Sequence, residues 1–78
     1  MTQEAALEQL NEIFRNVLFN PNLEITAATT QDDVAEWDSL SNAMLVVEIE
    51  SVFKKKFKTR EIEQWKSVQN ILDSIFRG

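Results

Sequence analysis

The 78-residue chain contains almost no glycine or proline, the two residues that most strongly interrupt regular structure. It has one glycine, Gly78, and one proline, Pro21. Tight hairpins depend on glycine and similar residues, because their central positions take positive φ angles that most residues avoid. A sheet of several strands would need such turns repeatedly. We therefore expect helices rather than strands, in a single domain covering residues 1–78.

Apolar residues recur at intervals of three and four, the spacing of a helix with one buried face. This spacing predicts helices over three ranges, about 3–18, 39–55 and 67–77. A shorter helix is expected over about 60–65, with Thr59 as its cap. The predicted fold class is all-α, an irregular four-helix bundle of three main helices and one short helix.

Residues 19–38 lack helical periodicity and form a long first loop in this prediction. A connection of about 20 residues without regular structure is unusual in a compact domain and usually has a function or is disordered. Here four apolar side chains would hold it against the core. They are Leu23, Ile25, Val34 and Trp37. We expect an ordered loop.

The chain has neither histidine nor cysteine. It therefore cannot build a Ser-His-Asp or Cys-His site, and it has no thiolate and no common structural zinc site. We expect no catalytic residue and no metal site, so the protein is predicted not to be an enzyme. No apolar run approaches the roughly 20 residues that a spanning helix needs, and the N-terminus does not resemble a signal peptide. The expected location is cytoplasmic, with no membrane span.

Charge is distributed unevenly within the formal net charge of −5. Residues 1–53 contain ten of the 13 acids and a single base, Arg15. Residues 54–78 contain the other seven bases and three acids. Phosphates would be repelled over most of such a surface, so we expect no nucleic-acid partner. A basic cluster follows the second predicted helix. It either binds an anionic partner or is simply a solvated helix end, the commoner case. Its members are Lys54, Lys55, Lys56, Lys58 and Arg60.

The second predicted helix has apolar residues on two sides. At 100° per residue, one stripe is expected to face the core. It consists of Leu45, Ile49, Val52 and Phe53. On the opposite side lie Leu40, Met44 and Val47, which we name the apolar strip. Three interpretations stay open: the bundle covers this helix on both sides, these are single exposed apolar residues of the kind that most protein surfaces have, or the apolar strip is a docking surface for a partner.

Ser39 stands at the start of this helix, where either it or Asp38 is expected to be the N-cap. Capping is the commonest role of a serine in this position. Catalysis by Ser39 is excluded, because a nucleophilic hydroxyl needs an adjacent base and the chain offers none. The remaining role is that of a substrate, modified by another enzyme. A phosphate group on Ser39 would lie near the positive end of the helix dipole, where free backbone N–H groups are available.

The sequence Asp38-Ser39-Leu40, at the start of a long helix after a long loop, resembles the acyl carrier protein family. A family-like pattern continues without gaps over positions farther along the chain. It includes Phe53, Phe57, Trp65, Ser67, Val68 and Ile71. The resemblance implies that Ser39 carries a covalent 4′-phosphopantetheine arm derived from coenzyme A. The arm's thiol would hold acyl intermediates as thioesters and present them to partner enzymes.

The resemblance also implies roles for the neighbours of Ser39. Asp38 would help position the phosphopantetheinyl transferase and its metal, and Leu40 would contact partners beside the arm. The other partner-binding candidates are Met44, Val47, Glu48 and Glu50. The expected partners are that transferase and the enzymes that load and process the acyl group. The carrier itself is expected to be a monomer.

Some positions depart from the pattern of fatty-acid-synthesis carriers. Those carriers typically have glycine where this chain has Glu36, and they often have an acid where it has Met44. Ser51 and Val52 likewise replace acids. The tryptophan immediately before the motif, Trp37, is a feature that the chain shares with carriers of specialised pathways. The resemblance therefore favours a dedicated or secondary-metabolic carrier, whose partner docking depends more on apolar contact than on charge.

Two alternatives stay open at this point. The chain is either a carrier or a helical protein-interaction module in which Ser39 is only a cap. Within the carriers, an aminoacyl or peptidyl carrier is the alternative to an acyl carrier.

Overall fold

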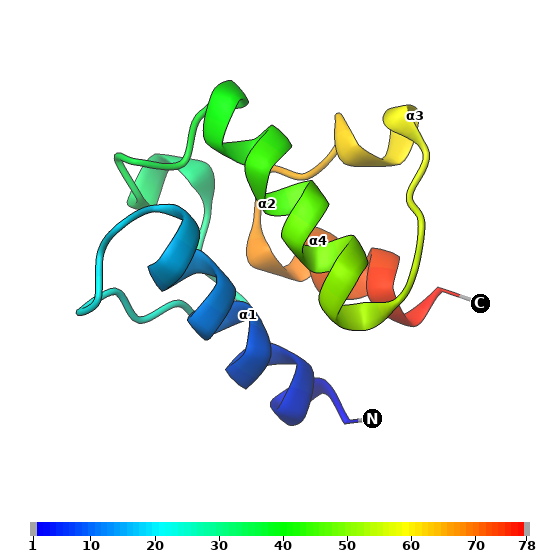
Figure 1. Cartoon of the computed structure of the whole chain (residues 1–78), viewed down its shortest axis with the longest axis horizontal. Coiled ribbons are helices and arrows are strands. Elements are labelled where there is room, and N and C mark those ends of the chain that lie inside the picture. The colour runs from blue at the N-terminus through cyan, green and yellow to red at the C-terminus, as the bar shows by residue number, and fades with distance from the viewer. Residues whose placement is uncertain (1, 78) are drawn as a thin grey trace.

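The computed structural model describes residues 2–77, which form four α-helices and one short 3₁₀ helix. The α-helices are α1 (Gln3–Val17), α2 (Ser39–Phe53), α3 (Thr59–Ile62) and α4 (Val68–Phe76), and η1 (Gln31–Asp33) lies in the first loop. Helix α1 packs against α2 and α4 (Figure 1). Within residues 2–77 the only bridge of β type is an isolated one between Thr30 and Ser67. The prediction of an all-α bundle with a long first loop is confirmed.

The two long helices end at residues with a left-handed backbone. Phe19 has a φ of 55° and Lys54 a φ of 52°. In each case the next N–H donates to the carbonyl five residues back, at 3.0 Å from Asn20 to Arg15 and 3.2 Å from Lys55 to Glu50. Glycine usually occupies this left-handed position, but the only glycine of the chain is elsewhere. These turns end the helices before the predicted limits of 18 and 55.

The short third helix differs from its prediction in two respects. Thr59 is the first helical residue, not the cap; Lys58 is the N-cap, and it makes no capping bond through its side chain. The helix ends at Ile62 rather than at 65. Beyond it the chain continues in tighter turns, in which the N–H of Trp65 donates to the carbonyl of Ile62 at 3.0 Å. Such three-residue spacing tightens the last turn and carries Trp65 into the core.

The core joins α1, α2, α4 and the first loop. Two aromatic pairs pack edge to face, Phe14 with Trp37 at 5.0 Å between ring centroids and Phe57 with Trp65 at 5.1 Å. The indole N–H of Trp65 donates to the buried hydroxyl of Ser74 at 2.9 Å, so this polar group is satisfied inside the core. The other buried apolar side chains are Ala6, Leu10, Ile13, Leu18, Ile25, Val34, Leu45, Ile49, Val68, Ile71 and Leu72.

One residue of the predicted core stripe is not in the core. Val52 is 39% exposed, whereas Leu45 and Ile49 are fully buried. Val52 belongs to the last turn of α2, at the edge of the core, where Phe53 packs against the buried cluster instead.

The first loop is ordered by contacts at both of its sides. Asn11 of α1 exchanges hydrogen bonds with the backbone of Ile25, accepting from its N–H at 2.8 Å and donating to its carbonyl at 3.1 Å. On the other side, the N–H of Val68 donates to the carbonyl of Thr29 at 2.8 Å, and the N–H of Gln31 donates to Lys66 at 3.0 Å. The loop therefore links α1 to the start of α4, and it delivers the chain to the start of α2 in a fixed position (Figure 1).

Two leucines of α2 provide a matched test of this packing. Leu45 is fully buried and Leu40 is 76% exposed. We predict that Leu45→Ala lowers the free energy of unfolding by about 2–5 kcal/mol, because it leaves a cavity, and that Leu40→Ala changes it by less than about 0.5 kcal/mol. Urea unfolding followed by circular dichroism measures both. If Leu45→Ala does not fold, Ile49→Val, with an expected loss of about 0.5–1.5 kcal/mol, replaces it. Equal effects at positions 40 and 45 would contradict the packing.

Candidate attachment and docking site

Ser39 is the first residue of α2, and its side chain is exposed to solvent. Its hydroxyl is not used to cap the helix. The cap is Asp38, whose carboxylate accepts from the N–H of Ser41 at 2.9 Å, while the Ser41 hydroxyl accepts from the N–H of Asp38 at 2.8 Å. The hydrogen bonds found within residues 2–77 do not include the Ser39 hydroxyl. A hydroxyl at the start of a long helix is thus left without a structural task.

Ser41 also connects the cap to the loop. Its hydroxyl donates to the carbonyl of Glu36 at 2.8 Å, in addition to accepting from Asp38. The start of α2 is therefore held to the last turn of the loop, and the direction in which Ser39 emerges is fixed. The pattern Asp-x-x-Ser is a variant of the capping box, in which N-cap and third helical residue satisfy each other's N–H groups. The Asp-x-x-Ser spacing is visible in the sequence and indicates Asp38, rather than Ser39, as the N-cap.

The pKa of the Asp38 carboxyl is lowered from its usual value of 3.8. The main cause is the hydrogen bond from the Ser41 backbone N–H, with a smaller contribution from the Leu40 N–H; together they outweigh desolvation, which raises the pKa. Each of these donors stabilises the ionised form. A negative charge also lies favourably at the N-terminus of a helix. Asp38 is thus anionic at neutral pH, directly beside Ser39.

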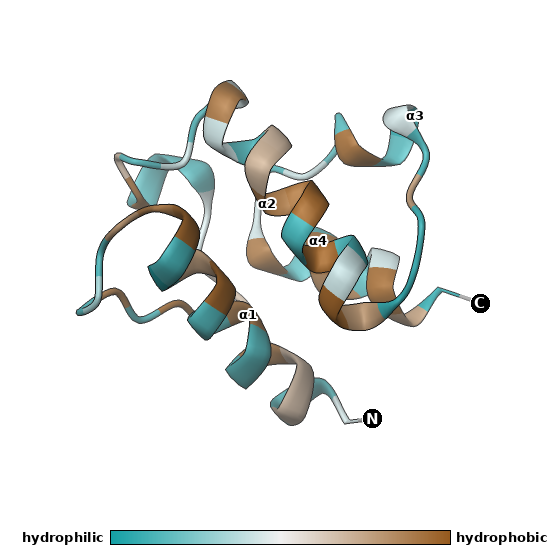
Figure 2. Cartoon of the chain, viewed as in Figure 1, coloured by the Kyte–Doolittle hydropathy of each residue, from teal (hydrophilic) through white to brown (hydrophobic). Residues whose placement is uncertain are grey.

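The apolar strip is exposed. Leu40 is 76% exposed, Val47 67% and Met44 46%, while Leu45 and Ile49 on the other side of α2 are buried. The bundle therefore covers one side of α2 only. The interpretation in which the bundle covers both sides is wrong, and the apolar strip is left exposed at the surface. Apolar residues occupy much of α2, whereas polar residues recur along the outward face of α1 (Figure 2).

The two glutamates proposed as partner contacts lie in different environments. Glu48 is exposed. Glu50 is half-buried; its carboxylate accepts from the Phe57 N–H at 2.9 Å and lies 3.7 Å from the Lys56 ammonium. Glu50 thus holds the segment after α2 in place, and Glu48 is the acidic side chain of this pair that α2 presents to solvent.

A shallow groove of about 350 Å³ begins at Ser39 and lies between α2 and α3. Asn42 contributes to it, and the side-chain oxygen of Asn42 accepts from the indole N–H of Trp37 at 2.9 Å. Because that oxygen is occupied by Trp37, the amide NH₂ of Asn42 is the half left to donate elsewhere. Helical periodicity does not reveal this bond. The other residues lining the groove are Gln31, Ala43, Ile62, Glu63, Trp65 and Lys66.

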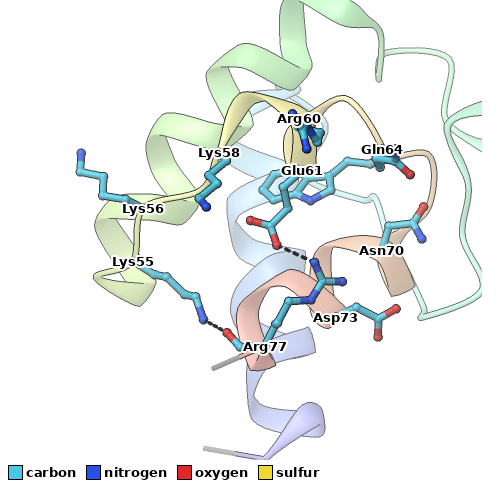
Figure 3. A pocket seen from close by; sticks show the side chains of 10 residues that line it. Lys55, Lys56, Lys58, Arg60, Glu61, Gln64, Asn70, Asp73 and Arg77 are labelled. Atoms are coloured by element: carbon cyan, nitrogen blue, oxygen red, sulfur yellow. Dashed lines mark hydrogen bonds and ion pairs between the residues drawn. The ribbon is translucent and has the colours of Figure 1, made fainter.

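The basic cluster is divided between structural roles and solvent. Lys55 donates through its ammonium to the carbonyls of Ile75, at 3.0 Å, and of Arg77, so it stabilises the end of α4 rather than the end of its own helix. Glu61 and Arg77 form an ion pair at 3.2 Å (Figure 3). These residues border an open pocket of about 590 Å³, on whose rim Lys58 and Arg60 are exposed. The cluster is therefore more than a solvated helix end, because Lys55 packs onto α4.

Within residues 2–77, no three carboxylates lie close enough together to hold a metal ion. In the same part of the chain, none of the helices has the length and apolar character needed to cross a membrane.

Solved structures of acyl carrier proteins resemble this chain along most of its length. The holo acyl carrier protein of Geobacter metallireducens, a solution NMR structure, is 35% identical, with a TM-score of 0.80 over 88% of this chain and 79% of that one. A putative acyl carrier protein from Mycobacterium tuberculosis is 26% identical, with a TM-score of 0.78 over 87% of this chain and 90% of that one. No protein-family model matches the chain, and no curated protein matches it either.

The identity to the Geobacter protein, over nearly four-fifths of that protein's length, shows the family. The chain belongs to the acyl carrier protein family.

The cap predicts a specific dependence on pH. The pKa of Asp38 is lowered in the folded state, so its contribution to stability is present above its ordinary pKa of 3.8 and is lost as the pH falls through the lowered value. Asp38→Asn keeps an acceptor for the cap but removes the charge. We predict that the wild type melts at a higher temperature than Asp38→Asn at pH 7, and that the difference disappears as the pH falls below the folded-state pKa. Thermal melts of both proteins across this range measure it. The other carboxylates are shared by the two proteins and cancel; a gap that does not change with pH would disprove the linkage.

Proposed function

We propose that the protein is an acyl carrier that bears a 4′-phosphopantetheine arm on Ser39 and presents acyl thioesters to enzymes acting in trans. It would do so as a monomer in the cytoplasm, without catalysing a reaction itself. The observation that supports this most is the Ser39 hydroxyl, which is exposed and takes no part in the cap formed by Asp38 and Ser41. A serine that only capped the helix would have its oxygen on a backbone N–H.

The surroundings of Ser39 fit the proposed group. A phosphodiester there would lie at the N-terminal end of a 15-residue helix, where the dipole favours negative charge. The groove beside Ser39 leaves room next to the side chain, and Asn42 has amide hydrogens available. The holo form of the Geobacter relative also supports a covalent arm in this family. When attached, the arm would supply the thiol that forms the thioester, since the chain has no cysteine.

The transfer would balance as a displacement at phosphorus. A bond forms between the Ser39 Oγ and the phosphorus of the phosphopantetheine, and the bond from that phosphorus to the nucleotide part of coenzyme A breaks. The hydroxyl proton would go to a base of the transferase, because the hydrogen bonds within residues 2–77 do not join Ser39 to a base. Asp38, anionic and adjacent, would help to position the transferase and its metal ion.

Docking of partner enzymes would use the apolar strip together with Glu48. The exposure of Leu40, Met44 and Val47 supports this, because apolar side chains at the centre of an interface contribute more binding energy than charges at its rim. Met44 replaces an acid expected in fatty-acid-synthesis carriers, which favours a dedicated or secondary biosynthetic pathway. Trp37 supports this less directly, because here it packs against Phe14 and serves the core.

The attachment site can be tested by intact mass. We predict that incubation with coenzyme A, Mg²⁺ and a promiscuous phosphopantetheinyl transferase adds one phosphopantetheine group to the wild type and none to Ser39→Ala. Ser51 is another exposed serine of α2, so Ser51→Ala is the matched control and should be modified like the wild type.

A folded wild type that gains no mass with several transferases would favour the alternative, a helical protein-interaction module. Mass gain with exclusive acceptance of aminoacyl groups afterwards would instead identify an aminoacyl or peptidyl carrier.

The apolar strip makes a second prediction. Met44→Glu should change the free energy of unfolding by less than about 0.5 kcal/mol, because the side chain is half exposed, but it should lower kcat/KM with transferases that dock on the strip. Val52→Glu introduces the same charge at the other end of α2, outside the strip, and serves as the control. Thermal melts and modification rates separate the two effects. A large loss of stability in Met44→Glu would show that Met44 contributes to the core.

A further inference from the structure

Phe19 occupies an unusual position at the end of α1. It is 85% exposed, more than any other large apolar side chain of residues 2–77. Its backbone is left-handed, with a φ of 55°, a conformation that is rare for residues other than glycine and an outlier for a bulky one. The side chain therefore gains no burial, and the backbone adopts an unfavourable conformation.

Lys54 provides an internal comparison. It ends α2 with the same backbone geometry and is also exposed. A lysine in solvent is expected at such a turn, because its charge is hydrated. The left-handed turn thus does not require an aromatic residue, and the needs of the fold do not explain the phenylalanine at position 19.

The turn at Phe19 is connected to the start of α2. The side-chain amide of Asn20 donates to the Glu36 carboxylate at 3.2 Å, and the carbonyl of Glu36 accepts from the Ser41 hydroxyl at 2.8 Å. Ser41 in turn forms the cap with Asp38, the residue before Ser39. Phe19 therefore precedes Asn20, a residue that is linked through Glu36 to the cap at the start of α2. Phe19 lies on the loop side of Ser39, whereas the apolar strip extends along α2.

The domain is small, so an enzyme bound over Ser39 would also cover neighbouring surface. A specific interface buries roughly 800 Å² per partner, a patch about 30 Å across, and the whole domain measures 31 × 25 × 21 Å. An open hollow of about 550 Å³ adjoins Phe19, between Arg15 and Pro21. The Nε–H of Arg15 donates to the carbonyl of Leu23, which fixes the Arg15 side chain beside this hollow.

We propose that Phe19 is a second apolar contact for the enzyme that modifies Ser39, inserting into an apolar recess of that enzyme on the loop side of Ser39. The proposal rests on the proposed function, since it needs an enzyme that acts at Ser39. Ser39 would then be held between two exposed apolar contacts, one on α2 and one at the end of α1. Aromatic side chains are prominent among the residues that dominate binding energy at interfaces.

The test is the rate of phosphopantetheine transfer from coenzyme A, measured as kcat and KM for the carrier, with the full chain. Phe19→Gly suits the left-handed backbone and should leave the melting temperature unchanged or higher, while lowering kcat/KM about tenfold, mostly through KM. Phe19→Trp keeps a large aromatic side chain and should retain most of the rate. Lys54→Gly makes the same backbone change at the other helix end and should leave the rate unchanged.

The outcomes are distinguishable. A tenfold loss in Phe19→Gly, with normal Phe19→Trp and Lys54→Gly, supports the contact. If Phe19→Gly is modified within about twofold of the wild-type rate, Phe19 is an exposed side chain without this role, and the proposed function is unaffected. If the wild type itself is not modified at all, both the proposed function and the contact at Phe19 are refuted.

Discussion

Asp38 and Ser41 exchange two hydrogen bonds that fix the residue at which α2 begins, and the rest of the site depends on this cap. With Asp38 as the N-cap, Ser39 becomes the first helical residue and keeps its hydroxyl free. The same cap is joined to the loop through the Glu36 carbonyl, so the long first loop and the helix present Ser39 as one unit. If Ser39 itself were the cap, its oxygen would be turned toward the helix and shielded from another enzyme.

The helix that starts at this cap has two apolar sides with different tasks. Its inner side, with Leu45 and Ile49, is buried against α1 and the aromatic core. Its outer side remains in solvent and extends along the helix from Ser39, the proposed attachment residue. An apolar surface beside a modifiable group is suited to enzymes that bind, act and leave, because its contacts need no exact pairing of charges. Phe19 extends this argument to the loop side of Ser39.

Much of the fold followed from the sequence. The scarcity of glycine and proline predicted helices, and the spacing of apolar residues located the long ones. The helix ends were predicted less accurately than the helices themselves. Residues 63–65 follow α3 in tighter turns because Trp65 must reach the core, and Val52 is exposed because the core ends before the last turn of α2. Both outcomes depend on where other elements pack, which local spacing does not contain. Glu50 likewise resembled a surface acid in the sequence, but it bonds to Phe57 after the chain turns back.

The sequence by itself determined the chemistry that is open to this protein. Without histidine or cysteine the chain offers no common base to activate Ser39, which predicts that another enzyme modifies this serine, and the Asp-Ser-Leu motif before a long helix indicated the acyl carrier protein family. Only the tertiary structure decided which side chain caps α2 and which side of α2 stays in solvent. It also decided that the turn at Phe19 is linked, through Asn20 and Glu36, to the start of α2. These properties arise from contacts between segments distant in the chain, as in the bond between Asn20 and Glu36, and a side chain's exposure is set by what packs over it rather than by its own identity.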